Sequence, residues 1–463
     1  MGRGARTGED YFLGGRDLPW VAVLLSVVAT ETSTLTFLSI PGVAYGGSLA
    51  FLQIAAGYVV GRVVVAFWLL PAYQTGRLST AYESLEERFG VGTRRMTSGI
   101  FMVTRLLADS VRLFATAIPL ALVTGWSLSV SVVVIGVATF VYTWAGGLKA
   151  VVWVDAVQMT LYLTGGLIAL ALLGVAVDGG WSAILADASA AGKLTVIDWS
   201  LDFGRPYTIW AGLLGGAFLS MGSHGADQLI VQRLLACRDL PASRRALIGS
   251  GIAVFAQFAL FLVVGLGLWA YYGGAAFERS DEIFATFIVD AMPTGVRGLL
   301  IAAVFAAAMS TLSSSINSLA SASAYDFWSA SRPEATQGDI LRVGRRLTWG
   351  WAILLVVAAL GFIPLSREST AVEVSLGIAS MIYGALLGAF ALARFAPRAD
   401  AFAARAAVVT GIAVVVIVWA AARTAVAWPW FVLVGTAATI GAGLLIAAFR
   451  SSGISDPGGR RGG

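Results

Sequence analysis

The chain has 463 residues, of which 58% are hydrophobic and only 12% are charged, about half the charged fraction of an ordinary soluble domain. This composition excludes a soluble globular protein and indicates a polytopic membrane protein. A single cysteine excludes an internal disulfide, and a single histidine excludes a histidine-rich metal site. The net charge of +5 arises from arginines in short loops, a pattern typical of membrane topology and not of nucleic-acid binding.

Apolar stretches long enough to cross a bilayer recur along the whole chain and predict an all-α protein with about twelve transmembrane helices. A single transmembrane transporter domain is expected over residues 1–450. The Gly-, Ser- and Arg-rich tail 451–463 is expected to be disordered. The predicted helices cover 19–44, 48–73, 97–123, 127–145, 153–176, 206–231, 245–272, 295–327, 342–364, 369–394, 405–422 and 428–449.

The loop charges predict the orientation of the chain. With a cytoplasmic N-terminus, about 22 basic residues, Arg94 and Arg233 among them, fall in cytoplasmic loops and about 6 in outer loops. Both termini of this multi-pass protein of the cell membrane are therefore predicted to be cytoplasmic. The sequence leaves open whether the protein is a monomer or a homo-oligomer.

The stretch 29–42, ATETSTLTFLSIPG, is unusual for the middle of a spanning helix. It carries an acid, Glu31, together with several hydroxyls and a Pro-Gly pair. A carboxylate at membrane depth is costly and usually faces a cavity or an ion path. We therefore expect a discontinuous helix whose unwound turn offers carbonyls to a cation. The alternative is a kinked helix whose Glu31 is paired elsewhere.

Ionisable residues also occur in the third and fifth predicted spans. Arg105, Asp109 and Arg112 lie at i, i+4 and i+7, so they share one helical face and can pair. A structural ion network is the favoured interpretation. The alternatives are a cationic site for an anionic substrate and a partner for Glu31. Asp155 is expected at the cytoplasmic mouth of the fifth span, either as a surface acid or as a group that receives a departing cation.

The stretch 220–228, SMGSHGADQ, places two glycines beside His224 in the sixth span and predicts a second broken or flexible helix. Transporters with five-plus-five inverted repeats place their two broken helices five spans apart, with the binding site between them. His224 is either a satisfied buried histidine or a ligand.

The stretch 306–318, AAAMSTLSSSINS, is rich in small and hydroxyl-bearing residues. Small residues let helices pack closely, and hydroxyls can also supply hard oxygen ligands for a small cation. By itself the run favours a packing seam. In the alternative, Ser310 and Thr311 flank one ion, while Ser314 is assigned to packing.

Together these stretches resemble the sodium:solute symporter family, which includes proline, sugar, iodide and vitamin transporters. The resemblance covers nearly the whole chain. It implies a five-plus-five core over about 18–394 and two extra helices over about 405–449. The motifs that carry it are DYFLGGR followed by LPW within 10–20, GGLKAV at 146–151, Asp227-Gln228 with Gln232-Arg233, and AMSTLSS at 308–314.

The resemblance implies a secondary active symporter that imports a small organic solute with sodium by alternating access. The galactose-binding Glu-Gln pair of the family aligns with Leu35-Thr36, which argues against a sugar and leaves a small organic anion or an amino acid preferred. The resemblance places the sodium ion between core helices one and eight. Its ligands would be the carbonyls of Ala29, Thr32 and Ala307 and the hydroxyls of Ser310 and Thr311.

The substrate is expected near the two breaks. A proton-coupled carrier and a non-transporting solute sensor are the rival functions, and an enzyme is not expected because no nucleophile–base spacing is present. Family members usually begin with an extra helix before the core, which is not seen here, so a truncated start stays open. The expected substrate-binding residues are Ser33, Thr36, Ser223, His224 and Arg112, with Glu31 and Asp155 on the ion path.

Overall fold

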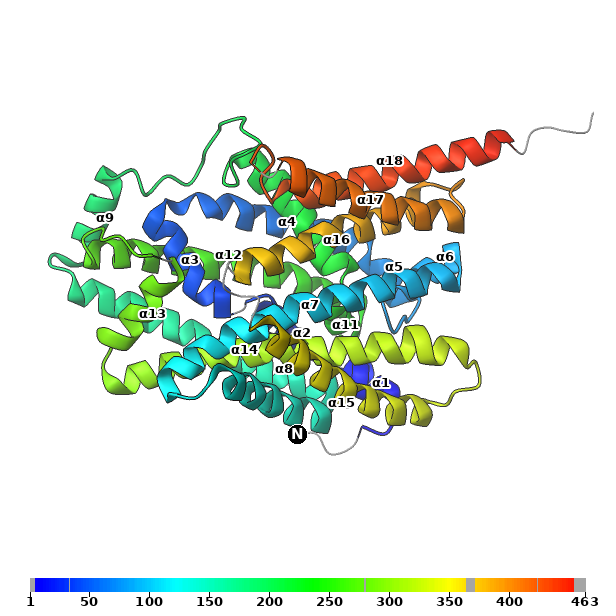
Figure 1. Cartoon of the computed structure of the whole chain (residues 1–463), viewed down its shortest axis with the longest axis horizontal. Helices are drawn as coiled ribbons and strands as arrows, with labels where there is room; N and C mark the ends of the chain where they lie inside the picture. Colours follow the sequence, from blue (N-terminus) through cyan, green and yellow to red (C-terminus); the bar gives the residue numbers. More distant parts are fainter. Residues whose placement is uncertain (1–4, 33, 279, 364–370, 423, 454–463) are drawn as a thin grey trace, which may run out of the picture.

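The structure is a computed structural model, and it describes residues 5–32, 34–278, 280–363, 371–422 and 424–453. Within these ranges the fold is helical, and the one β-type pairing is an isolated bridge between Leu18 and Cys237. Most helices run along the long axis of the molecule, with α9 and α13 at one end and α6 and the end of α18 toward the other (Figure 1). Residues 454–463 of the predicted disordered tail lie outside the described residues.

The first half of the chain contains two short helices, α2 and α3, near its start. Two 3-10 turns, Gly14–Arg16 and Leu49–Phe51, link them to the elements on either side. The helices are α1 (Gly8–Leu13), α2 (Trp20–Glu31), α3 (Thr34–Gly46), α4 (Leu52–Trp68), α5 (Leu70–Thr75), α6 (Glu83–Phe89), α7 (Val91–Thr124), α8 (Leu128–Ala176) and α9 (Gly180–Ala190).

The second half contains three π-helical segments beside its α-helices: η3 (Ala211–Gly215), η4 (Gly222–Ala226) and η5 (Ser323–Trp328). A 3-10 turn, Ser329–Ser331, follows the last of them. The helices are α10 (Gly216–Met221), α11 (Gln228–Leu235), α12 (Leu240–Tyr271), α13 (Ser280–Asp290), α14 (Thr294–Ala322), α15 (Gln337–Phe362), α16 (Ala371–Phe395), α17 (Ala401–Ala422) and α18 (Trp430–Gly453).

Each predicted span is mostly helical over its described residues, with extended residues at Thr32 and Asp227, so the all-α prediction is confirmed for the described chain. Seven helical segments of the described chain are long and apolar enough to cross a membrane. Large apolar side chains such as Val157, Leu167 and Ile417 are more than half exposed on the outer helices, as expected for surfaces that face lipid instead of water. The count of about twelve crossings stays a prediction.

The predicted fourth and fifth spans are two helical stretches of one element, α8, which meet at a kink at Gly147. Gly147 has φ 56° and ψ −155°, a conformation almost restricted to glycine. A Cβ atom here would lie 2.4 Å from the carbonyl oxygen of Tyr11 in α1. Glycine is therefore required both for the bend and for the close approach of α1.

Candidate ion and solute sites

The first predicted break is confirmed at the end of α2. Glu31 is the last residue of α2, and Thr32 is extended with φ −80° and ψ 101° before α3 begins at Thr34. Pro41 lies inside α3 and does not end it. Ser33, a predicted substrate ligand, lies outside the described residues. Thr36 lies in the first turn of α3, directly after the break.

The second predicted break is confirmed beside His224. The π-helical turn η4 ends at Ala226, and Asp227 is extended with φ −97° and ψ 119°. The Asp227 carboxylate then caps the next helix by accepting a hydrogen bond of 2.9 Å from the Leu229 N–H group. An acid directly after a glycine-rich turn is typical of a helix N-cap.

The hydroxyls of Ser310 and Thr311 in α14 face two different neighbours, Asp155 of α8 and the end of α2. The Ser310 hydroxyl donates to an Asp155 carboxylate oxygen at 2.7 Å, so its lone pairs remain free to bind a cation. The Thr311 hydroxyl lies 3.4 Å from the carbonyl oxygen of Thr30. One expected sodium ligand, the Thr311 hydroxyl, therefore lies beside a carbonyl of the last turn of α2, and the other, the Ser310 hydroxyl, lies beside Asp155. Ala307 belongs to the same helix, three residues before Ser310.

Asp155 is fully buried beside this cluster, so the surface-acid alternative is wrong, while its role on the ion path stays a prediction. Its carboxylate accepts a 2.5 Å hydrogen bond from Ser26 of α2 and lies 3.4 Å from the guanidinium of Arg233. The bend in α8 and the packing of α14 and α2 on this helix enclose the side chain. Asp155 thus links the two helices that carry the expected sodium ligands.

Arg233 is also completely buried, which corrects its assignment to a cytoplasmic loop. Arg233 lies in α11, which begins after the extended Asp227, and its side chain donates to the Ser26 hydroxyl at 2.9 Å. Arg233 also contacts Ser314, whose hydroxyl lies 3.1 Å from that of Thr30. The assignment of Ser314 to packing alone is therefore wrong.

The predicted ion network of α7 forms as expected from its spacing. Asp109 lies 3.5 Å from Arg105 and 3.1 Å from Arg112. Arg105 also contacts Asp227 at the second break, and the Tyr383 hydroxyl of α16 lies 2.8 Å from both groups. Arg105 and Arg112 are not the partners of Glu31, so that interpretation is wrong.

The partner of Glu31 is Arg62 of α4, a residue that the sequence patterns did not single out. The Arg62 guanidinium contacts Glu31 Oε2 and donates to the Ser250 hydroxyl of α12 at 2.8 Å. His224 Nε2 lies 3.6 Å from the same carboxylate oxygen, and the Ser223 hydroxyl is 2.8 Å from His224 Nδ1. A lone arginine inside an otherwise apolar span was the available signal for this pair.

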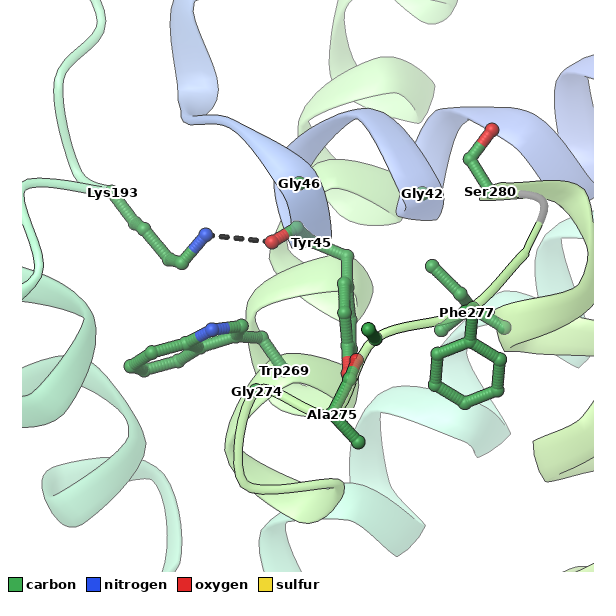
Figure 2. A pocket seen from close by; sticks show the side chains of 11 residues that line it. Gly42, Tyr45, Gly46, Lys193, Trp269, Gly274, Ala275, Phe277 and Ser280 are labelled. Atoms are coloured by element: carbon green, nitrogen blue, oxygen red, sulfur yellow. Dashed lines mark hydrogen bonds between the residues drawn. The ribbon is translucent and has the colours of Figure 1, made fainter.

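A cavity of about 390 Å³ lies at the far end of α3, and the described residues that line it include none of the predicted substrate residues. Figure 2 shows the Lys193 ammonium group donating to the Tyr45 carbonyl, at 2.6 Å, above the ring of Trp269. Burial lowers the pKa of Lys193. This cavity is therefore separate from the two breaks.

Two broken helices that bring buried hydroxyls, carbonyls and paired charges together define a membrane transporter for a cation and a solute. The profile of the sodium:solute symporter family matches residues 11–411. The chain belongs to the sodium:solute symporter family.

The relatives extend this assignment over nearly the whole chain. The sodium/sialic acid symporter NanT of Aliivibrio fischeri is 31% identical over 455 residues, which cover 96% of this chain and 88% of the relative. The human sodium/iodide cotransporter is 29% identical over an alignment that covers 86% of this chain and 62% of the cotransporter. The solved structure of a Na⁺-coupled sialic acid symporter in a substrate-bound outward-open state is 28% identical, with a TM-score of 0.86. The match covers 96% of this chain and 93% of the symporter.

The protein is therefore a sodium-coupled symporter of a small solute, with Na⁺ as the coupling ion and the membrane as its location. This confirms the predicted family, the predicted function and the prediction that the chain is a transporter and not an enzyme.

Proposed function

We propose that this symporter imports a small organic anion together with sodium by alternating access on a five-plus-five inverted-repeat core. Sialic acid and iodide, which two of the relatives are named for, are both anions. Arg112 supports the same class of solute in this chain. Its side chain is 20% exposed and pairs only with Asp109 among the described residues, which leaves much of the guanidinium available for a carboxylate.

The proposed sodium site lies between the end of α2 and the middle of α14. The observation that carries it is the position of the Thr311 hydroxyl beside the carbonyl of Thr30, with the neighbouring Ser310 hydroxyl oriented by Asp155. Sodium binds weakly to single oxygens, so several must converge. The proposed ligands are the carbonyls of Ala29, Thr32 and Ala307 and the hydroxyls of Ser310 and Thr311.

The solute is proposed to bind between the two breaks, and sodium to favour the outward-open state that accepts it. Asp155 and Glu31 would then flank the ion path, and both termini would be cytoplasmic. The residues proposed to contact the solute are Ser33, Thr36, Ser223, His224 and Arg112.

Sodium titrations of the purified protein test the ion site even while the solute is unidentified. Ser310→Ala or Thr311→Ala removes one ligand, which costs about 1–2 kcal/mol and so weakens sodium affinity about tenfold. The matched control is Ser318→Ala, because Ser318 is equally buried in α14 and its hydroxyl donates only to the Ser315 carbonyl of the same helix. A double variant with unchanged sodium affinity would show that sodium binds elsewhere.

Uptake into proteoliposomes tests the coupling itself. Replacing external sodium by choline at constant pH is expected to abolish solute uptake. Uptake that persists in choline and follows an imposed pH gradient would instead support proton coupling in this chain.

A further inference from the structure

The space between Glu31 and His224 lacks a hydrogen-bond donor. Glu31 ends α2 at the first break, and His224 lies in η4 at the second. Glu31 Oε2 and His224 Nε2 are 3.6 Å apart, which is too far for a direct hydrogen bond. His224 is 1% exposed, and its Nε2 has no hydrogen-bond partner among the described residues. A buried polar atom without a partner is costly unless a ligand supplies one.

The surroundings of His224 indicate which of its nitrogens carries the hydrogen. Nδ1 lies 3.2 Å from the carbonyl oxygen of Ser220, which can only accept a hydrogen bond. The Ser223 hydroxyl donates to the same carbonyl at 3.4 Å, so its lone pairs can face Nδ1 as a second acceptor. We assign the hydrogen to Nδ1 on the basis of this carbonyl, and in the neutral ring Nε2 is then an acceptor. An acceptor then faces the carboxylate of Glu31, and a donor is needed between them.

The arginine that pairs with Glu31 leaves this side of the carboxylate open. Arg62 is completely buried, contacts Oε2 of Glu31 and directs Nη1 to the Ser250 hydroxyl at 2.8 Å. The side chain of Glu31 is 21% exposed. Its Oε1 accepts no hydrogen bond from the part of the chain that the structure describes. The accessible face of the pair is thus its carboxylate.

Building on the proposed function, we propose that Glu31 and His224 form a subsite for an uncharged donor of the solute, a hydroxyl or an amide N–H. The transported anion would then carry such a donor beside its carboxylate. The Glu31–Arg62 pair is already neutral, so an uncharged donor can give its hydrogen to one of the two acceptors without adding an unbalanced buried charge. An ammonium group would place a second cation beside Arg62.

Nitrogen NMR can test this arrangement directly, because His224 is the single histidine of the chain. Protein labelled with ¹⁵N-histidine is expected to show a protonated Nδ1 and an unprotonated Nε2 in sodium buffer. L-lactate, which carries a hydroxyl beside its carboxylate, is expected to shift the Nε2 signal. Propionate lacks the donor and should require at least about tenfold higher concentration to bind. L-alanine replaces the hydroxyl by an ammonium group and is expected to bind less well than lactate.

Several results would overturn the proposal: a protonated Nε2, equal responses to lactate and propionate, a response to alanine in place of lactate, or no sodium-dependent response to any of the three acids. Equal responses would mean that water fills the space between the acceptors.

Variants separate this subsite from the transport function on which it rests. His224→Leu keeps the Glu31–Arg62 pair, and it is expected to lower the preference for lactate over propionate to about twofold or less while sodium still stabilises the protein. Ser250→Ala removes the other partner of Arg62 and is expected to keep the preference. A His224→Leu protein with the full preference would overturn the subsite. A wild-type protein with no sodium response would instead refute the proposed sodium site.

Discussion

Replacing Asp155 by asparagine should perturb two roles of one carboxylate. One oxygen accepts the hydrogen bond of Ser310 at 2.7 Å, and the other lies 3.4 Å from Arg233. Both charges are fully buried. Asp155→Asn therefore leaves the guanidinium without its counter-ion, which should cost roughly 3–5 kcal/mol of stability. It also removes the negative charge from the acceptor that orients the proposed sodium ligand.

A second substitution separates the two effects. Arg233→Met in the same chain removes the unbalanced charge, and replacing both members of a buried ion pair by uncharged groups is often nearly neutral. The double variant Asp155→Asn/Arg233→Met is thus expected to regain most of its stability. Its sodium affinity should stay low, because a hydrogen bond to a charged group is worth about 1.5–3 kcal/mol, which is roughly 10- to 150-fold in affinity.

The assay needs the wild type, both single variants and the double variant, purified in detergent. Chemical unfolding gives stability, and sodium titration followed by the fluorescence of the 15 tryptophans gives affinity. If the double variant regains wild-type sodium affinity together with stability, Asp155 serves only to balance Arg233, and its role at the ion site is refuted.

Three other outcomes follow from the structure. Arg112→Gln is expected to weaken binding of a carboxylate solute about tenfold with little change in thermal midpoint, because Asp109 keeps its other ion pair; unchanged affinity would remove Arg112 from the solute site. Gly147→Ala should destabilise the protein by more than roughly 1–3 kcal/mol. Gly350→Ala is the control, because its added Cβ would meet no atom within 4 Å. Equal thermal midpoints for the two variants would contradict the requirement for glycine at the bend. A topology reporter fused after Arg461 should be active only in the cytoplasm, and a periplasmic signal would reverse the orientation.

The two helix breaks could be predicted from the sequence because their causes are local. Hydroxyls and an acid at membrane depth, or glycines around a histidine, each disfavour a continuous apolar helix within a few residues. The pairing of Arg105, Asp109 and Arg112 was equally accessible, since helical spacing alone places them on one face. In each case the structure-determining contacts lie within about two turns of the chain.

The partners of the remaining buried charges could not be predicted in this way. Arg62 and Glu31 come from different helices, and Arg233 and Asp155 are separated by 78 residues. Hydropathy and loop-charge rules treat an arginine near a span end as a solvated residue. They carry no information on a helix that restarts after a break and turns its arginine inward. The sequence does show acids at similar depth in other spans. Only the packing of the helices, however, shows which acid pairs with which arginine.

The position of Glu31 suggests a short physical route from ion to solute. The proposed sodium ligands Ala29 and Thr32 stand on either side of it in the chain, and Thr32 also bonds Gln257 of α12 at 3.1 Å. An ion that fixes these carbonyls fixes the last turn of α2, and with it the direction of the Glu31 side chain. A solute that engages Glu31 restrains the same turn. Since coupling between two binding sites is reciprocal, sodium must strengthen solute binding by the factor by which the solute strengthens sodium binding. In this arrangement both factors arise from the ordering of a single unwound turn.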